Sequence, residues 1–112
     1  MNKDHLKDFL ETNNCPECDL DGIEIEGEDF EEAFLLGADL RNAKFVNCNF
    51  TGANLSGADL QGCQLIDTDL TDADLSGANL TDSNLSSAII SNTDFVNAIL
   101  TRSLLPKDAK LG

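Results

Sequence analysis

The sequence of 112 residues has no tryptophan and no tyrosine, and its only histidine is His5. A globular core built around large aromatic rings is therefore not expected. The first ten residues, MNKDHLKDFL, contain no apolar run of the length that a signal peptide needs, and no stretch is apolar over the length that crosses a bilayer. We therefore expect a cytoplasmic protein without a membrane-spanning helix.

Basic residues are also scarce. Seven Lys and Arg stand against 21 Asp and Glu, which gives a formal net charge of −14. A surface of this charge repels the phosphates of nucleic acids and anionic membranes, so direct binding to either is not expected. Cations, basic peptides and the DNA-binding surfaces of other proteins are the partners that suit it, although acidity also serves solubility alone.

A five-residue repeat occupies most of the chain. From Leu20 to Leu105 every fifth residue is Leu, Ile or Phe, at all eighteen positions, and sixteen of the eighteen residues two places earlier are Ala, Ser, Thr or Cys. The exceptions at the smaller position are Ile23 and Glu28. The large apolar residues, which we expect to form a stacked core, are Leu20, Ile25, Phe30, Leu35, Leu40, Phe45, Phe50, Leu55, Leu60, Leu65, Leu70, Leu75, Leu80, Leu85, Ile90, Phe95, Leu100 and Leu105.

The period of five fits neither regular element. On an α-helix it would carry the apolar stripe around the whole cylinder, and on one strand it would send alternate apolar residues to opposite faces. Inward positions spaced alternately two and three residues apart instead indicate a short extended step followed by a corner. Gly, Asp and Asn crowd the corner positions, as at Gly52 and Gly57, and these residues favour turns.

The motif A-[DN]-L-x-x, unbroken in Ala53-Asn54-Leu55-Ser56-Gly57, resembles the repeat of the pentapeptide-repeat proteins. The resemblance extends over residues 18–107. It implies an all-β solenoid, specifically a right-handed quadrilateral β-helix with about 20 residues per coil and about four and a half coils. Apolar side chains one coil apart would stack, and the narrow lumen would be filled rather than open.

A rod of this kind exposes apolar side chains and backbone groups at both ends, so it needs caps. Residues 1–14 are predicted to form an N-terminal capping helix, with Leu6, Phe9 and Leu10 on the face that covers the coil. Asn2 is the predicted N-cap. The β-helix is expected over residues 15–107. The tail, 108–112, has no helical pattern, so the C-terminal end is expected to be bare.

Four cysteines are present. Cys15 and Cys18, in the sequence C-P-E-C, suit a redox pair, half of a zinc site, a disulfide that braces the first coil, or two reduced thiols. Zinc would lack two further ligands, and a cytoplasmic setting favours the reduced thiols over the disulfide. Cys48 and Cys63 occupy the small inward position and are predicted to fill the core. No metal ion or other cofactor is expected.

Acidic residues are concentrated at the N-terminal end, where residues 1–32 hold twelve of the 21 and only Lys3 and Lys7 oppose them. The candidate partner surface on the first coil consists of Asp19, Asp21, Glu24, Glu26, Asp29, Glu31 and Glu32. The segment from Glu17 to Glu28 also mimics an EF-hand loop, although no second helix follows, and calcium binding there is an alternative. Glu28 has an inward register, which a loose end coil or the backbone groups of the cap could accommodate.

Apolar residues also occupy outward positions near both ends. Phe34 and Leu36 are expected to pack under the capping helix or its linker. The C-terminal group, which replaces the usual Asp or Asn, is Ile89, Ile99 and Leu104. These residues predict an end-to-end homodimer through the C-terminal coil. In the competing interpretation the chain folds back after Leu105, Leu111 plugs the last layer, and the protein is a monomer.

The sequence shows no catalytic motif. It has no GxSxG sequence, no phosphate loop and no dinucleotide-binding fingerprint, and carboxylates on a convex, filled rod have no cleft to shift their pKa values. We therefore predict a non-enzymatic protein-binding or scaffold module, with a partner that the sequence does not identify. As an alternative, the resemblance implies a DNA mimic that binds a type II topoisomerase and protects gyrase, as some members of that family do.

Overall fold

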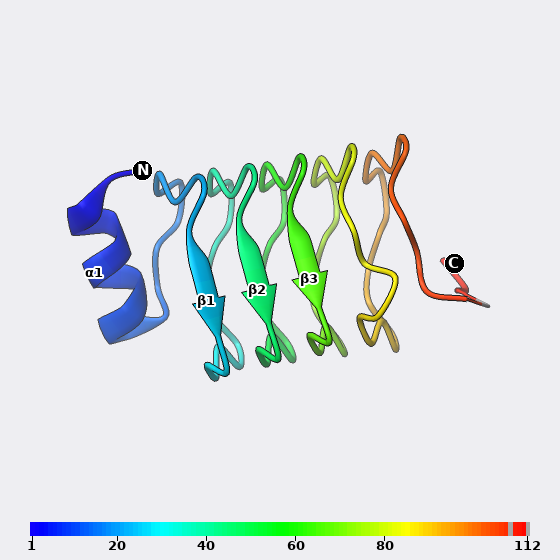
Figure 1. The fold of residues 1–112 in the computed structure, drawn as a ribbon, viewed down its shortest axis with the longest axis horizontal. Coiled ribbons are helices and arrows are strands. Elements are labelled where there is room, and N and C mark those ends of the chain that lie inside the picture. Colours follow the sequence, from blue (N-terminus) through cyan, green and yellow to red (C-terminus); the bar gives the residue numbers. More distant parts are fainter. Residues whose placement is uncertain (108, 112) are drawn as a thin grey trace.

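The computed structural model describes residues 1–107 and 109–111. A short helix stands at one end of an elongated coil, and the molecule measures 38 × 22 × 19 Å (Figure 1). Helix α1 spans Lys3–Thr12, and strands β1 (Glu24–Glu26), β2 (Lys44–Val46) and β3 (Gln64–Ile66) form one parallel sheet in the order β1-β2-β3. Within the described residues, no helix combines the length and the hydropathy needed to span a bilayer.

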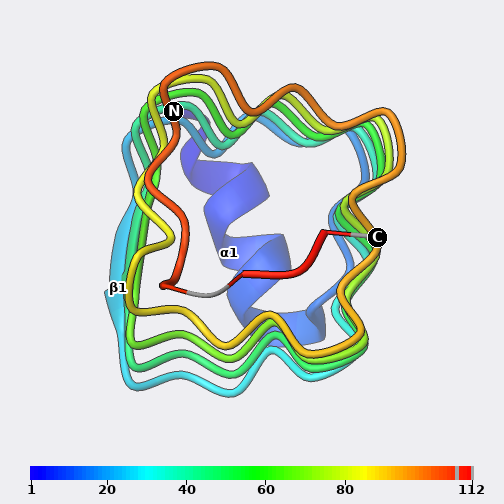
Figure 2. The same ribbon diagram turned by 90° about the vertical axis from the view of Figure 1, so that its right-hand side faces the viewer.

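Paired residues lie twenty positions apart in sequence. Glu24 of β1 pairs with Lys44 of β2, and Lys44 pairs with Gln64 of β3. Isolated bridges repeat the same offset on the other sides of the coil, as between Asp39 and Asp59. Successive coils therefore superpose when the molecule is viewed along its axis (Figure 2).

The corners follow the sequence pattern. Two residues after most inward apolar residues the backbone adopts a positive φ, as at Gly57 (66°) and Asp72 (60°). Glycine, Asn and Asp tolerate this conformation better than other residues. An Asp or Asn side chain also braces many corners, because its Oδ1 atom accepts the N–H two residues later, as from Ser56 to Asn54 at 3.0 Å.

The lumen is filled by the inward residues. From Leu35 to Leu85 each large apolar residue of the repeat is at most 2% exposed. Phe30, Phe45 and Phe50 form an aromatic cluster, with ring centroids 5.0 Å apart between Phe45 and Phe50. The predicted stack is only partly buried at its two ends, at Ile25, Ile90, Leu100 and Leu105.

Helix α1 is capped at both ends, and its N-cap is the predicted Asn2. The Oδ1 atom of Asn2, the N-cap, accepts the N–H of Asp4 at 2.9 Å and that of His5 at 3.2 Å. Asn13 closes the helix in a left-handed conformation, with a φ of 57°, and donates its N–H to the carbonyl of Phe9 at 2.8 Å. The helix lies across the N-terminal end of the coil (Figure 2).

The inner face of α1 is narrower than the sequence suggested. Phe9 is fully buried and stacks on Phe30 with a centroid distance of 4.5 Å, and Leu6 packs at the margin of the core. Leu10 is 48% exposed, so its predicted place on the covering face was wrong. One helical residue turns the side chain by about 100°, and the contact of Phe9 with the lumen leaves Leu10 facing solvent.

Candidate functional site

The first-coil acidic surface comprises the seven carboxylates predicted for partner binding, and they fall into two groups. Asp19 and Asp21 lie beside the amino group of Met1, whose nitrogen is 2.7 Å from Oδ1 of Asp21 and 3.8 Å from Oδ2 of Asp19. The hydrogen bond from this amino group holds the pKa of Asp21 below its usual value. This side of the coil therefore presents compensated charge.

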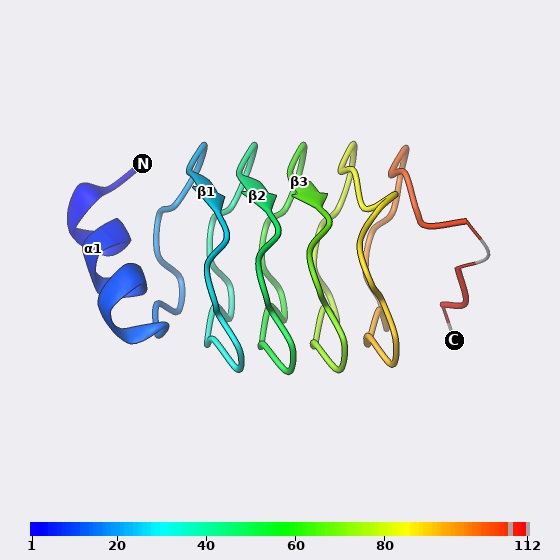
Figure 3. The same cartoon turned by 60° about the horizontal axis from the view of Figure 1, so that its bottom comes forward.

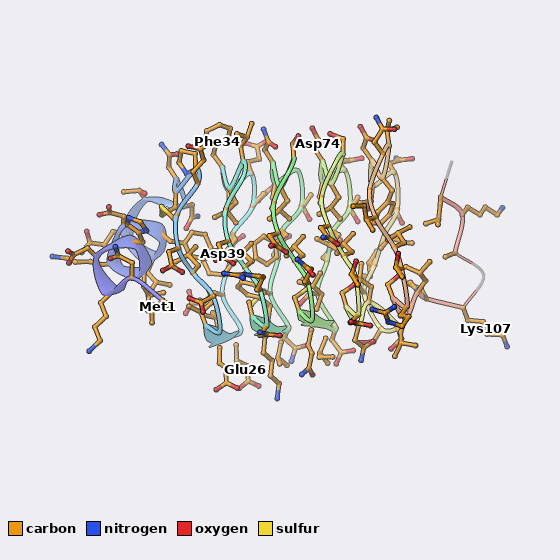
Figure 4. The ribbon with its side chains drawn as sticks, turned by 90° about the horizontal axis from the view of Figure 1, so that it is seen from above. Met1, Glu26, Phe34, Asp39, Asp74 and Lys107 are labelled. Carbon is orange, nitrogen blue, oxygen red and sulfur yellow. A yellow bond between two sulfur atoms is a disulfide. The ribbon has the colours of Figure 1, made fainter. Side chains whose placement is uncertain are left out.

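The next coils continue that compensated row. Arg41 donates from Nη2 to Oδ2 of Asp39 at 2.8 Å, and its Nε atom lies 3.8 Å from Oδ2 of Asp59. The Arg41 hydrogen bond lowers the pKa of the Asp39 carboxyl. Figure 4 shows that Met1 and Asp39 occupy the same side of the rod, whereas Glu26 projects from another side.

The remaining acids of the surface form no salt bridge within the described residues. Glu24, Glu26, Glu31 and Glu32 are exposed, and no described cation lies within salt-bridge distance of their carboxylates. Asp29 is partly engaged, because its Oδ1 atom accepts the N–H of Glu31 at 3.0 Å and the side-chain amide of the second coil's Asn49 at 3.2 Å. The acids that form no salt bridge are thus concentrated on and after β1, where Lys44 of β2 pairs in register with Glu24.

Calcium binding is not supported by this geometry. Among residues 1–107 and 109–111, no three His, Cys, Asp or Glu side chains converge in a way that could hold a metal ion. The residues that mimic an EF-hand loop instead follow the coil around its corners, so their side chains diverge. The Glu28 side chain is exposed despite its inward register, which agrees with an end coil that is open beside it.

The two N-terminal cysteines are joined. Cys15 and Cys18 form a disulfide across a Cα–Cα distance of 5.4 Å, so the prediction of reduced thiols was wrong. That expectation used the compartment alone, and the turn that leads from α1 into the coil brings both side chains together. Cys48 and Cys63 are free thiols in the core, 2% and 0% exposed, and burial raises the pKa of Cys63 to about 12.

Comparison with known proteins identifies the fold. The family profile described as pentapeptide repeats matches residues 29–62 and 63–102, in eight copies. The chain belongs to the pentapeptide-repeat family. Among curated proteins none matches it.

Solved structures of the same family are similar to this pentapeptide-repeat protein. The chain is 26% identical to alr5209, a pentapeptide-repeat protein from Nostoc PCC 7120, over 96% of this chain and 87% of that one, with a TM-score of 0.66. It is 20% identical to Rfr23 from the cyanobacterium Cyanothece 51142, over 92% of this chain and 98% of that one, with a TM-score of 0.64. The fold and the extent of the chain are therefore close to those of both proteins.

The C-terminal end of this pentapeptide-repeat coil carries apolar residues around its outside. The predicted group is exposed at 51% for Ile89, 47% for Ile99 and 58% for Leu104. Val96, which the sequence analysis did not select, is 63% exposed on the same coil. Val96 directly follows the inward Phe95, at the start of a corner, and its register alone could have identified it.

The C-terminal segment, red in Figure 3, leaves the coil, and the last bridged residue is Leu104. Lys110 stands in the sequence where the next inward apolar residue would be, so the repeat cannot continue. A hollow of about 650 Å³ separates the tail from the last layer, between Ile90 and Leu111 among others, and Leu111 remains 41% exposed. The described part of the tail therefore folds back across the end of the coil, as the competing interpretation expects, but Leu111 does not plug the layer (Figure 2). Two residues of the predicted tail, Asp108 and Gly112, lie outside the described residues.

Phe34 and Leu36 were expected beneath the cap, and this was wrong. Their side chains are 38% and 39% exposed, and Figure 4 places Phe34 on the outer side of the rod. The linker after α1 pairs with Phe34 through its backbone, by bonds between Asn13, Cys15 and Phe34, and does not cover the ring. The repeat pattern also did not predict that the Met1 amino group contacts Asp21 or that His5 accepts the N–H of Asp19.

Proposed function

We propose that this protein is a non-enzymatic binding module whose first-coil acidic surface engages a basic region of a partner protein. The observation that supports this is the separation of its carboxylates into two groups. Those beside Met1 and Arg41 form salt bridges, whereas Glu24, Glu26 and their neighbours after β1 form none within the described residues, although Lys44 pairs in register with Glu24. Uncompensated charge on a rigid support favours encounter with a basic surface.

The architecture assigned to this scaffold is a right-handed, four-sided β-helix of about four and a half coils. The twenty-residue offset between paired residues, from Glu24 to Lys44 and from Lys44 to Gln64, supports it. A filled lumen presents only its outer faces and ends to other molecules, which suits a scaffold rather than an enzyme. Its partner is a protein, and direct contact with nucleic acid is not part of the proposal.

A quantitative capture experiment tests this function. Immobilised wild type is compared with a variant in which Glu24, Glu26, Glu31 and Glu32 are replaced by Gln, and bound proteins from native lysate are quantified. We expect a partner that is retained by wild type and lost from the variant. The matched control removes charge elsewhere on the rod, through Asp67→Asn and Asp72→Asn, two exposed corner residues, and it should retain the partner. Equal capture by all three proteins would contradict the proposal.

A topoisomerase-binding DNA mimic is the second candidate. The transverse dimensions of 22 × 19 Å, together with the net charge of −14, favour it because they approach the width and the charge of a DNA duplex. The concentration of acid at one end and the pairing of Asp39 with Arg41 weigh against it. A gyrase supercoiling assay is decisive, because an unchanged rate at a large molar excess of this protein would remove the candidate.

We also propose that two copies meet end to end through their C-terminal coils. The exposed side chains of Ile89, Ile99 and Leu104 support this arrangement, since they surround a last layer in which Leu100 and Leu105 are only partly buried. A two-fold axis would cover both ends at once. The acidic surfaces would then stand at the two far ends of the dimer.

A further inference from the structure

The first coil has an outer edge, where no preceding coil supplies hydrogen bonds. The segment around α1 satisfies this edge at several places. Asp19 donates its N–H to Nδ1 of His5 at 2.8 Å and accepts the N–H of Asn2 at 3.1 Å. Asn14 bonds to the hydroxyl of Thr12, with its N–H donating at 3.1 Å. Asn13, directly after α1, donates its side-chain amide to the backbone carbonyl of Asp29 in the first coil at 3.4 Å.

Strand β1 is the part of this edge that α1 leaves open. The ladder to β2 uses Lys44 N–H to the carbonyl of Ile23 and Gly27 N–H to the carbonyl of Val46, each at 2.8 Å. Alternate residues of a strand direct their N–H and C=O groups to opposite sides, so those of Glu24 and Glu26 point away from β2. No group in residues 1–107 or 109–111 forms a hydrogen bond with them.

The core beneath this open edge is also incomplete. Ile25 is only partly buried, whereas Phe45 and Leu65, which stack in the same column, are 0% and 1% exposed. Phe9 covers Phe30 on the neighbouring side, and Ile25 keeps an exposed portion even though Leu6 of α1 also packs against the core. An additional apolar side chain would therefore be stabilised at this position by burial against Ile25.

We propose that the β1 edge binds an extended basic–apolar–basic segment of a partner protein by parallel strand addition. In such a pairing the central residue lies opposite Ile25, covers the lumen, and bonds to Glu24 and Glu26 through its own N–H and C=O. The flanking residues lie beside the Glu24 and Glu26 carboxylates, so Lys or Arg is selected there. This inference rests on the proposed function and specifies the partner segment.

The charges on β1 also decide which strands are rejected. A second copy that offered the same edge would place its own glutamates against Glu24 and Glu26, and like charges directly opposite destabilise a strand pair. Acidic residues on an edge thus prevent self-association. If the glutamates served only to prevent self-association, the edge would bind no basic strand, so binding of a basic peptide distinguishes the two roles.

The probe is a fluorescein-labelled peptide, Thr-Lys-Ile-Lys-Thr, titrated with the full-length protein at low ionic strength and followed by fluorescence polarisation. We expect saturable binding that is absent for the peptide with Glu in place of both Lys. Removing both carboxylates through Glu24→Gln and Glu26→Gln should weaken binding about tenfold, because two cross-strand charge pairs are lost. The matched control, Asp67→Asn with Asp72→Asn, should change it by less than about twofold.

A second variant separates strand pairing from charge. Glu26→Pro removes an N–H that the β1–β2 ladder does not use, and proline is tolerated on edge strands. Its melting temperature should therefore stay near that of wild type. Its binding of the peptide should fall well below that of Glu26→Gln. N-methylation of the central peptide amide should abolish binding to the unaltered protein, which keeps the test decisive even where the proline variant fails to fold.

The outcomes distinguish this inference from the function on which it rests. Binding that needs the carboxylates but survives both Glu26→Pro and N-methylation would overturn strand addition and leave the acidic surface as a partner site. Failure of the wild type to bind the peptide would overturn the inference, and the lysate capture would still test the proposed function. Equal binding of the Lys and Glu peptides would refute the basic selectivity.

Discussion

Replacing Phe9 by alanine should uncover the N-terminal end of the core. The ring is fully buried and stacks on Phe30 at a centroid distance of 4.5 Å, with an interplanar angle of 23°. Truncation of a buried phenylalanine costs about 3–5 kcal/mol of unfolding free energy, and the aromatic pair accounts for about 0.5–1.5 kcal/mol. Within the described residues the printed contacts of α1 are with the first coil, so its detachment limits the loss, and we expect a loss of about 3 kcal/mol.

The measurement is urea denaturation followed by circular dichroism. Leu10→Ala is the control on the same helix, because a side chain that is 48% exposed should cost less than about 1 kcal/mol. The comparison tests the register of α1 on the coil. Similar losses from the two variants, or a Phe9→Ala loss below about 1 kcal/mol, would refute the placement of Phe9 over Phe30.

The other predictions concern the core, the thiols, the ion pairs and the assembly. Leu60→Ala should lower the unfolding free energy by about 2–5 kcal/mol, since Leu60 is 1% exposed, and an effect below this range in the same urea assay would argue against a filled lumen. Cys48 and Cys63 should resist alkylation at neutral pH in the native protein and react after unfolding, because burial raises the pKa of both thiols. Rapid labelling of either thiol in the native protein, measured by mass spectrometry, would contradict their burial. Arg41 and Arg102 lower the pKa values of Asp39 and Asp82 below those of the unfolded chain, so their stabilisation is present at neutral pH and is lost as the pH falls below about 4. Melting curves of Arg102→Gln should therefore differ from wild type at pH 7 and converge with it in acid. Light scattering should give a dimer for wild type and a monomer for the Ile89→Asp, Ile99→Asn, Leu104→Asp variant, and a wild-type mass near 12.0 kDa at high micromolar concentration would exclude the dimer.

The repeat could be predicted from sequence because its inward positions are repeated so often. Every fifth residue is apolar from Leu20 to Leu105, and the same register places Gly, Asp and Asn at the corners with positive φ. The family match confirms the repeat assignment. The helix was also recognisable, because Asn2 and Asn13 mark its ends by local hydrogen bonding.

The first-coil contacts could not be predicted in the same way. Leu10, the Cys15–Cys18 pair and the salt bridge from Met1 to Asp21 all depend on where α1 crosses the coil. A hydrophobic stripe fixes which side of a helix is buried only to within about one residue. It carries no information about the direction of the helix over the end, so the open edge of β1 became visible only in three dimensions.

Because paired residues always lie twenty positions apart, insertions and deletions could change the length of the rod and the relative rotation of its two ends independently. Glu24 faces Lys44 and Lys44 faces Gln64, so loss of residues 41–60 would stack Leu40 on Leu80 and shorten the rod without introducing a new kind of core contact. Loss of a single five-residue unit ahead of Ile99 would instead move that residue into the column of Asp74 and Asp94. Insertions and deletions of whole units would therefore set the distance and the rotation between the two ends of the rod while leaving the residues at each end unchanged.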